Sequence, residues 1–181
     1  MSSFRPRLPL RALGAMTDDG AAAGPPPAVG AQVVHATSVA IDGRGVLLRG
    51  PSGCGKSELA LCLIDAGARL IADDVSLVWA DGAAAVVGGP PEQHGCLSLD
   101  DVGLLELPAV ASAPLALVVD LVPGGPAAAG KPTAGWGEAT TAQLAGIRIA
   151  SFVADPHLPS TSAKIRAVLR RMLPPSGAGE P

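Results

Sequence analysis

The sequence has very few aromatic residues and only an odd number of cysteines. Among its 181 residues, aromatic residues make up 2% and tyrosine is absent, although 48% of the residues are hydrophobic. We therefore expect a core built from alanine, valine, leucine and isoleucine. Cys54, Cys62 and Cys96 cannot form a paired disulfide framework. They are typical of the reduced thiols of a cytoplasmic protein.

Excess positive charge and long apolar runs are also lacking. The formal net charge is −3, which does not favour a dedicated nucleic-acid binder. No apolar run approaches the roughly 18 residues of a membrane-spanning helix. We therefore expect neither a nucleic-acid partner nor a membrane partner.

The two ends of the chain differ in composition from the middle. Residues 1–30 contain three arginines and then a stretch rich in Ala, Gly and Pro, without the continuous apolar segment of a secretory signal. This composition predicts a disordered tail at 1–30, one domain at 31–173 and a second disordered tail at 174–181. Alternatively, the first segment is a basic arm for a partner, or translation starts at Met16.

One motif dominates the middle of the chain. It matches the phosphate-binding pattern G-x-x-x-x-G-K-[ST]. The apolar run 46–49 before it predicts a strand, and residues 58–66 after it predict a helix that ends at Gly67. Glycines let the backbone approach phosphate oxygens, and the helix N-terminus adds positive potential. We expect Lys56, as an exposed loop cation, to reach the phosphates and the Ser57 hydroxyl to bind Mg²⁺. The nucleotide-binding residues are then Gly50, Pro51, Ser52, Gly53, Cys54, Gly55, Lys56 and Ser57.

Short strands and hairpin turns fill most of the remaining domain. Turn residues at 42–45 and 80–83 separate β-rich runs and predict two antiparallel hairpins. Residues 123–137 are rich in Gly, Pro and Ala, and we expect a mobile loop there. The fold class is α/β, with more hairpins than a doubly wound sheet. Strands are expected at 33–41, 46–49, 68–72, 75–79, 84–87, 115–120 and 147–152, and a last helix from about Ser160.

Three further residues accompany the phosphate loop. His35 lies on the strand expected to pair with the phosphate-loop strand, and Asp73 and Asp74 end the strand after the helix. With the loop, they resemble the catalytic domain of the HPr kinase/phosphorylase family, over about residues 32–172. The resemblance implies a P-loop fold similar to that of phosphoenolpyruvate carboxykinases, in a short form without the family's N-terminal domain. It also makes a homo-oligomer plausible.

The resemblance implies a function and a set of catalytic residues. Family members use ATP to phosphorylate a serine of the phosphocarrier protein HPr, in carbohydrate and phosphotransferase-system signalling, and they can reverse the reaction. By resemblance, Asp74 takes the serine proton, Asp73 is its neighbour and His35 stands beside the base. The chemistry agrees, because a serine that attacks the γ-phosphoryl group needs a positioned proton acceptor. The catalytic residues are His35, Lys56, Asp73 and Asp74, and the cofactors are ATP and Mg²⁺.

The resemblance weakens after the second hairpin. Ser98 stands where the family has a metal-associated Glu, Asp100 replaces an Arg and Asp101 a Gly. The loop 123–137 has Lys131 and no Arg. We expect Asp100 to replace the lost Glu in part, because residues two apart in a strand share a face. Phosphorolysis is the activity that these changes put most in doubt.

Other functions remain open or are excluded. A GTPase is excluded, because guanine selection needs N-K-x-D and the sequence contains no asparagine. Asp120 ends an apolar run and is either a Walker-B-like Mg²⁺ residue or an ordinary strand-end residue. The main alternative to the kinase is an ATP-binding sensor of the same fold with little or no catalysis. A small-molecule kinase is a third hypothesis.

Overall fold

The computed structural model describes residues 30–130 and 140–172. Outside the described residues therefore lie most of the first predicted tail, all of the second predicted tail, and Lys131. No helix in the described part is long and apolar enough to cross a membrane. The strands are β1 (Gln32–Ile41), β2 (Arg44–Arg49), β3 (Arg69–Ala72), β4 (Val75–Asp81), β5 (Ala84–Gly88), β6 (Cys96–Leu99), β7 (Gly103–Glu106), β8 (Ser112–Leu121), β9 (Thr140–Leu144) and β10 (Ile147–Ala154), and the helices are α1 (Lys56–Asp65), α2 (Gly125–Ala128), α3 (Thr161–Arg171) and the 3₁₀ helix η1 (Pro91–Gln93).

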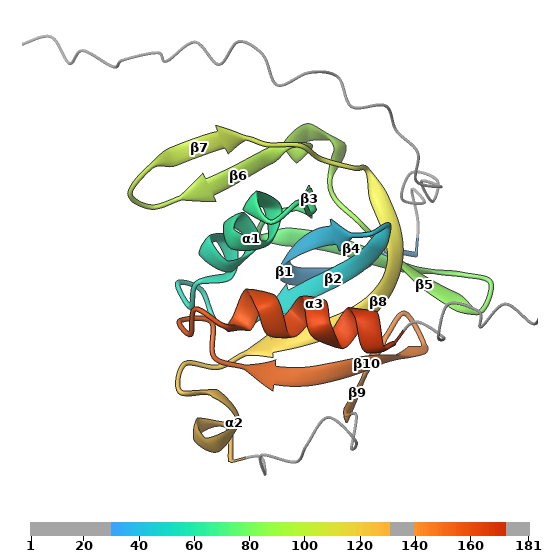
Figure 1. Ribbon diagram of the computed structural model, residues 1–181. Helices are drawn as coiled ribbons and strands as arrows, with labels where there is room; N and C mark the ends of the chain where they lie inside the picture. Colours follow the sequence, from blue (N-terminus) through green and yellow to red (C-terminus); the bar gives the residue numbers. More distant parts are fainter. Residues whose placement is uncertain (1–29, 131–139, 173–181) are drawn as a thin grey trace, which may run out of the picture.

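The main sheet curls until two of its strands meet. Its order is β2-β1-β4-β5-β8-β10-β9, and β2 also pairs with β8, so that five strands form a closed ring. β3 pairs with β1 on the edge opposite β2. β8 runs parallel to β2 and to β10, and the remaining pairings of this sheet are antiparallel. β6 and β7 form a separate hairpin that lies beyond α1 (Figure 1).

The strand before the phosphate loop is central and fully buried. β2 lies between β1 and β8, and Val46, Leu47 and Leu48 are all 0% exposed. Val46 and Leu48 pack in the cluster that contains the helix residues, while Leu47 packs in the cluster that contains β4 and β5 residues. Both faces of β2 are thus covered, which explains its continuous apolar run. The phosphate loop therefore starts from a rigid position.

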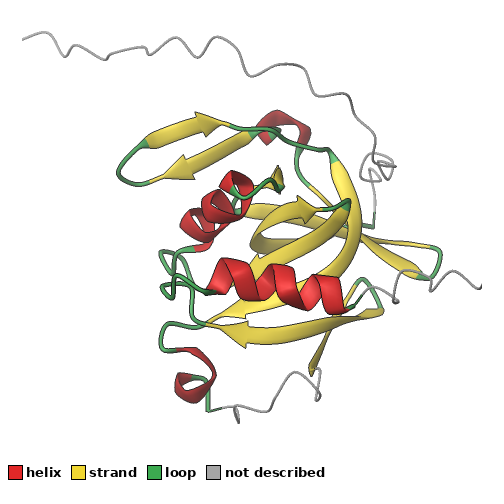
Figure 2. Cartoon of the chain, in the orientation of Figure 1, coloured by secondary structure: helices red, strands yellow, loops and turns green. Residues whose placement is uncertain are grey.

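Two helices cover the same face of the curled sheet (Figures 1 and 2). Leu59 and Leu63 of α1, and Ile165 and Leu169 of α3, are spaced by four residues and are buried in one cluster. Arg166 of α3 donates to the Leu63 carbonyl at 2.9 Å, near the end of α1. A cation there satisfies a terminal carbonyl and complements the helix dipole. This contact fixes α3 against the helix that follows the phosphate loop.

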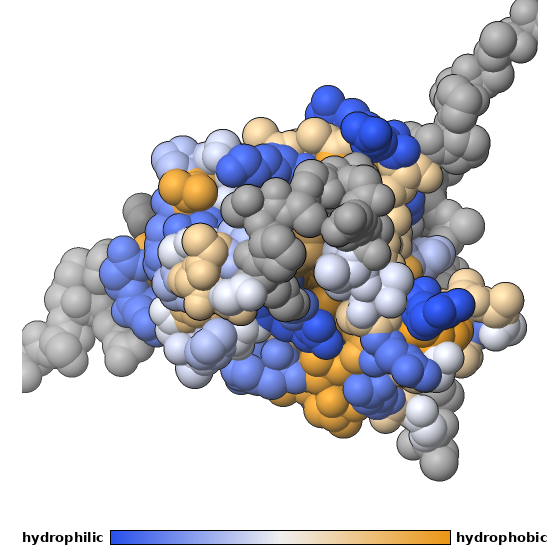
Figure 3. Space-filling view, turned by 90° about the horizontal axis from the view of Figure 1, so that it is seen from below, coloured by the Kyte–Doolittle hydropathy of each residue, from blue (hydrophilic) through white to orange (hydrophobic). Residues whose placement is uncertain are grey.

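The underside of the molecule, in the orientation of Figure 1, shows no dominant apolar expanse. Seen from below, hydrophilic and hydrophobic residues are interspersed over the described part of this face (Figure 3). The larger exposed hydrophobic side chains include Val102 and Leu104 of the β6–β7 hairpin. The apolar residues of the sequence therefore serve mainly to fill the two internal clusters.

Most expected elements are present. The β6–β7 hairpin was not among the expected strands, and two further differences have simple causes. Both predicted hairpins, β1–β2 and β4–β5, are confirmed. β9 was not predicted, because only Ala142 and Leu144 of its five residues turn inward. The prediction of a loop throughout 123–137 was wrong, since α2 occupies 125–128. Pro126 suits the first helical turn, and Gly124 precedes it with a φ of 83°.

Candidate active site

The phosphate loop owes its shape to three glycines. A Cβ on Gly50 would lie 2.6 Å from Cys54 Sγ and 2.9 Å from the Leu121 carbonyl, so no side chain fits there. Gly53 and Gly55 have φ values of 72° and 94°, in the left-handed region that favours glycine. Gly55 is the N-cap of α1. The loop therefore wraps directly onto the helix N-terminus, as an anion site requires.

Lys56 lies inside this loop and is not exposed. Its exposure is 7%, and its Nζ donates to the carbonyls of Gly50 at 3.2 Å and Pro51 at 3.0 Å. The expectation of an exposed loop cation was therefore wrong. The buried stem aims the ammonium group at the concave side of the loop, where it also lines a cavity. Its charge is held close to where phosphate oxygens would bind.

Asp73 connects four elements through its carboxylate. Its Oδ1 accepts from Thr37 Oγ1 on β1 at 2.8 Å and from Ser57 Oγ on α1 at 2.9 Å. Its Oδ2 accepts from the Ser98 backbone N–H on β6 at 2.9 Å. Asp73 follows β3 and is only 9% exposed, so the three donors compensate its burial. Both of its oxygens are thus occupied.

Asp74 has the opposite environment. Its side chain is 69% exposed, and its Oδ1 lies 3.1 Å from Nδ1 of His35, whose side chain is 51% exposed. Asp74 has a φ of 63°, and the Val75 N–H donates to the Asp73 carbonyl at 2.7 Å across it. This is a γ-turn of the rare, strained kind with positive φ. Such strain is concentrated at functional sites and turns the Asp74 side chain away from its buried neighbour.

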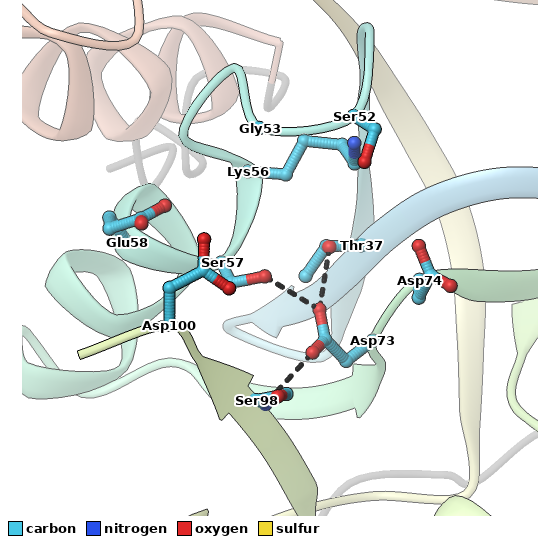
Figure 4. Close-up of a pocket in the computed structure, with 10 residues that line it drawn as sticks. All are labelled: Thr37, Ser52, Gly53, Lys56, Ser57, Glu58, Asp73, Asp74, Ser98 and Asp100. Carbon is cyan, nitrogen blue, oxygen red and sulfur yellow. Dashed lines mark hydrogen bonds between the residues drawn. The ribbon is translucent and has the colours of Figure 1, made fainter. Parts of the chain in front are cut away.

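A cavity of about 320 Å³ brings most of the predicted residues together (Figure 4). The phosphate loop and α1 form one wall, and the middle of β1 with the ends of β3 and β6 forms the other. His35 is not part of the lining but reaches the cavity through Asp74. The lining residues are Thr37, Ser52, Gly53, Lys56, Ser57, Glu58, Asp73, Asp74, Ser98 and Asp100.

Thr37 and Glu58 are lining residues that the sequence reasoning missed. Each had a signal. Thr37 is two residues after His35 and therefore lies on the same face of the strand. Glu58 directly follows Ser57 in the motif. Neither position belongs to the phosphate-loop pattern itself, which explains the omission.

The donor atoms of the cavity fit a magnesium ion. Ser57 supplies a hydroxyl, and Asp73 and Asp100 supply carboxylates in the same lining. Mg²⁺ prefers oxygen ligands and usually takes only one or two carboxylates from the protein, the remainder coming from phosphates and water. The described residues hold no group of three or more His, Cys, Asp or Glu side chains that could form an all-protein metal site.

Asp100 reaches the cavity by a different route from the one expected. It lies in the turn after β6, which ends at Leu99, so it shares no strand face with Ser98. The argument from strand geometry was wrong, although both residues line the cavity. At this turn position the Asp100 side chain is exposed.

Asp120 is engaged outside the cavity. Its Oδ1 accepts from the Arg49 guanidinium, at 2.9 Å from Nε and 2.8 Å from Nη2. Arg49 ends β2 and lies opposite Asp120 in the β2–β8 pairing. Asp120 is not among the lining residues, so the described geometry favours the ordinary strand-end role over the Walker-B-like one.

Comparison with known proteins identifies the domain. Residues 29–112 match the sequence model of the HPr Serine kinase C-terminal domain. The HPr kinase/phosphorylase of Enterococcus faecalis is 45% identical over 76 residues, which cover 41% of this chain and 24% of that protein. That of Leptothrix cholodnii is 44% identical over 77 residues, 42% of this chain and 24% of the relative. Over residues 29–112 the chain is thus similar to the HPr kinase C-terminal domain.

The HPr kinase C-terminal domain also matches in three dimensions. The structure of the Hpr(Ser) kinase/phosphatase from Coxiella burnetii has a TM-score of 0.67 and 25% sequence identity, covering 77% of this chain and 95% of that chain. The sequence matches span only about a quarter of the curated relatives' length, 24% in both cases above. The matched residues 29–112 include every residue that lines the cavity.

Proposed function

We propose that this chain is an ATP-dependent serine kinase that acts on an HPr-type phosphocarrier protein in the cytoplasm and regulates carbohydrate and phosphotransferase-system signalling. The observation that carries the proposal is the His35–Asp74 pair. Its carboxylate lies in the same cavity as the phosphate loop and is exposed to an incoming substrate. A domain that only bound nucleotide would need no exposed, strained carboxylate there.

The phosphate loop is the proposed site for the triphosphate of ATP. The backbone N–H groups at the start of α1 and the Lys56 ammonium provide the positive potential. Ser57, with Asp73 and Asp100 nearby, would hold the Mg²⁺ ion. When bound, this ion neutralises charge on the phosphates. Asp73 already orients the Ser57 hydroxyl through a hydrogen bond, so the ligand oxygen is held in place.

Asp74 is the proposed acceptor of the serine proton. The serine oxygen forms a bond to the γ-phosphorus, the bond between that phosphorus and the β,γ-bridging oxygen breaks, and ADP leaves. The proton of the serine hydroxyl passes to the Asp74 carboxylate. His35, at 3.1 Å, orients this carboxylate. Asp73 is less suited to this task, because three donors already occupy its oxygens.

The alternative is an ATP-binding sensor with little or no transfer. The changes at Ser98 and Asp100 favour it, since both residues fall in the wall opposite the phosphate loop, and Asp101 is a third change in the turn next to them. Among the family's activities, these changes weigh most against phosphorolysis, in which inorganic phosphate attacks phosphoserine. The retained His35, Asp73 and Asp74 favour the kinase. We also propose a homo-oligomer, which sedimentation of the full chain would test.

A single assay separates the two functions. Purified chain, Mg²⁺ and γ-labelled ATP are incubated with an HPr protein, and label on HPr and free phosphate are measured together. The kinase predicts label on a serine of HPr. The sensor predicts tight Mg-ATP binding without label. Incubating phosphoserine-HPr with inorganic phosphate tests the reverse reaction in the same preparation.

A further inference from the structure

A second cavity lies beside the phosphate site. Its volume is about 160 Å³, and it separates α1 from the segment that joins β10 to α3. The α1 side consists of Glu58, Leu59 and Cys62. The residues on the other side are Pro156, His157, Leu158, Pro159 and Ser162.

The two cavities are neighbours along α1. Glu58 lines both of them. A Cβ built on Gly55, the last residue before α1, would lie 3.5 Å from Pro156 Cβ and 3.6 Å from His157 Cε1. The 156–157 segment therefore packs directly against the end of the phosphate loop. A ligand that leaves the loop past Glu58 would enter the second cavity.

The segment that forms the far wall is held in place by Asp155. Its Oδ1 accepts from the His157 N–H at 3.0 Å, and its Oδ2 accepts from the Gly124 N–H at 3.1 Å. The Thr161 hydroxyl donates to the Asp155 carbonyl at 2.6 Å. These bonds fix both ends of the segment before any ligand arrives. A preorganised wall reduces the entropy lost on binding.

The chemistry of this cavity suits a flat aromatic ring. Leu59, Pro156, Leu158 and Pro159 supply apolar surface, and the His157 imidazole can stack on a ring. Small-molecule sites typically combine such an apolar lining with a few polar groups. We propose that this second cavity binds the adenine ring of the ATP whose triphosphate occupies the phosphate loop. This inference rests on the proposed function, because it takes the ligand to be a nucleotide.

Two ligands separate the base from the phosphates. Isothermal titration with Mg-ATP and with Mg-tripolyphosphate measures the binding of the whole nucleotide and of its phosphates alone. Wild type should bind ATP at least about tenfold more tightly than tripolyphosphate, the usual worth of one stacked base. Equal affinity for the two ligands would contradict the proposed base site but would still support the phosphate site. If neither ligand binds, both the base site and the proposed function are contradicted.

Two variants then locate the contribution of the base. Cys62→Trp fills the cavity from an exposed position of α1, and His157→Ala removes the stacking ring from an exposed position. Both should weaken ATP binding, Cys62→Trp by about tenfold or more, with tripolyphosphate affinity unchanged within twofold. His94→Ala, at another exposed histidine that lines neither cavity, should change neither affinity. Unchanged ATP affinity in both variants would overturn the proposal, and His157→Ala decides it should Cys62→Trp fail to fold.

Discussion

The Ser57 hydroxyl donates a hydrogen bond to Asp73 Oδ1 at 2.9 Å, which links the phosphate loop to the end of β3. Asp73→Ala removes this acceptor and also those of Thr37 and Ser98. Buried donors without a partner cost about 1–3 kcal/mol each, so the free energy of unfolding should fall by roughly 2–4 kcal/mol. Urea denaturation measures this loss, and the Mg²⁺ concentration for half-maximal activity should rise in the same variant.

A substitution that removes only one of the three donors tests the same relationship. Thr37→Val keeps the shape of the buried side chain and removes one of the three donors, so its loss should be about 1 kcal/mol. It should leave the Mg²⁺ dependence close to that of wild type, because Ser57 still has its acceptor. An Asp73→Ala protein as stable as wild type would show that this network does not hold the strands together.

Asp74→Asn should separate binding from chemistry. The backbone N–H groups, Lys56 and Mg²⁺ hold the phosphates, so ATP affinity should change by less than about tenfold. Transfer to serine should fall by roughly 10²–10⁴-fold, the usual value of a positioned general base. Single-turnover transfer and equilibrium ATP binding, measured on one preparation, give the two quantities.

Neighbouring variants decide which carboxylate is the base. His35→Ala should reduce transfer less than Asp74→Asn, because the imidazole acts through the carboxylate that it contacts at 3.1 Å. Asp73→Asn replaces one accepting oxygen with an amide NH₂ group that faces a hydrogen-bond donor. It should therefore mainly lower the free energy of unfolding and raise the Mg²⁺ concentration needed for activity. An inactive but stable Asp73→Asn protein beside an active Asp74→Asn protein would reverse the two roles.

Lys56→Met should abolish nucleotide binding while keeping the packing of the buried aliphatic stem. The loop carbonyls of Gly50 and Pro51 lose a donor, so we expect a stability cost of about 1 kcal/mol. Fluorescence titration with a labelled ATP analogue and thermal unfolding measure both effects. Lys164→Met, at an exposed position of α3, is the matched control and should change neither. Retained Mg-ATP affinity in Lys56→Met would mean that the nucleotide binds elsewhere.

Asp100→Ala should raise the Mg²⁺ concentration needed for half-maximal activity. Its carboxylate lines the cavity from the turn after β6. In the cavity wall opposite the phosphate loop, it is the third acidic side chain besides Asp73 and Asp74. Asp101→Ala is the control, because Asp101 is its exposed neighbour and does not line the cavity. If both variants show the Mg²⁺ dependence of wild type, Asp100 does not replace the missing family glutamate.

Local patterns in the sequence predicted the parts of the site that are continuous in the chain. The phosphate loop follows from its glycines, and its flanking strand and helix follow from an apolar run and a Gly stop. The pairing of β1 with β2 follows from the turn at 42–45. His35 lies just outside this pairing and faces Val75 of β4, the residue after Asp74. The contact between His35 and Asp74 was expected from family resemblance and is present at 3.1 Å.

Contacts that depend on tertiary packing were not predictable in this way. The burial of Lys56 depends on how the loop folds back over its own carbonyls. The network at Asp73 joins residues up to 36 positions apart, and no local spacing announces it. His157 lies about a hundred positions after the phosphate loop in the sequence, yet the β10–α3 segment places it against Gly55 at the end of that loop. β9 was not predicted from the sequence because its two inward-facing residues give too weak a period-two pattern.

The most direct test of the account is transfer of the γ-phosphoryl group from labelled ATP to HPr by the wild-type chain and by Asp74→Asn. We predict that wild type labels HPr on a serine, and that Asp74→Asn binds Mg-ATP within about tenfold of wild type but labels HPr at least roughly 10²-fold more slowly. A wild-type chain that binds Mg-ATP tightly and leaves HPr unlabelled would contradict the kinase and support the sensor.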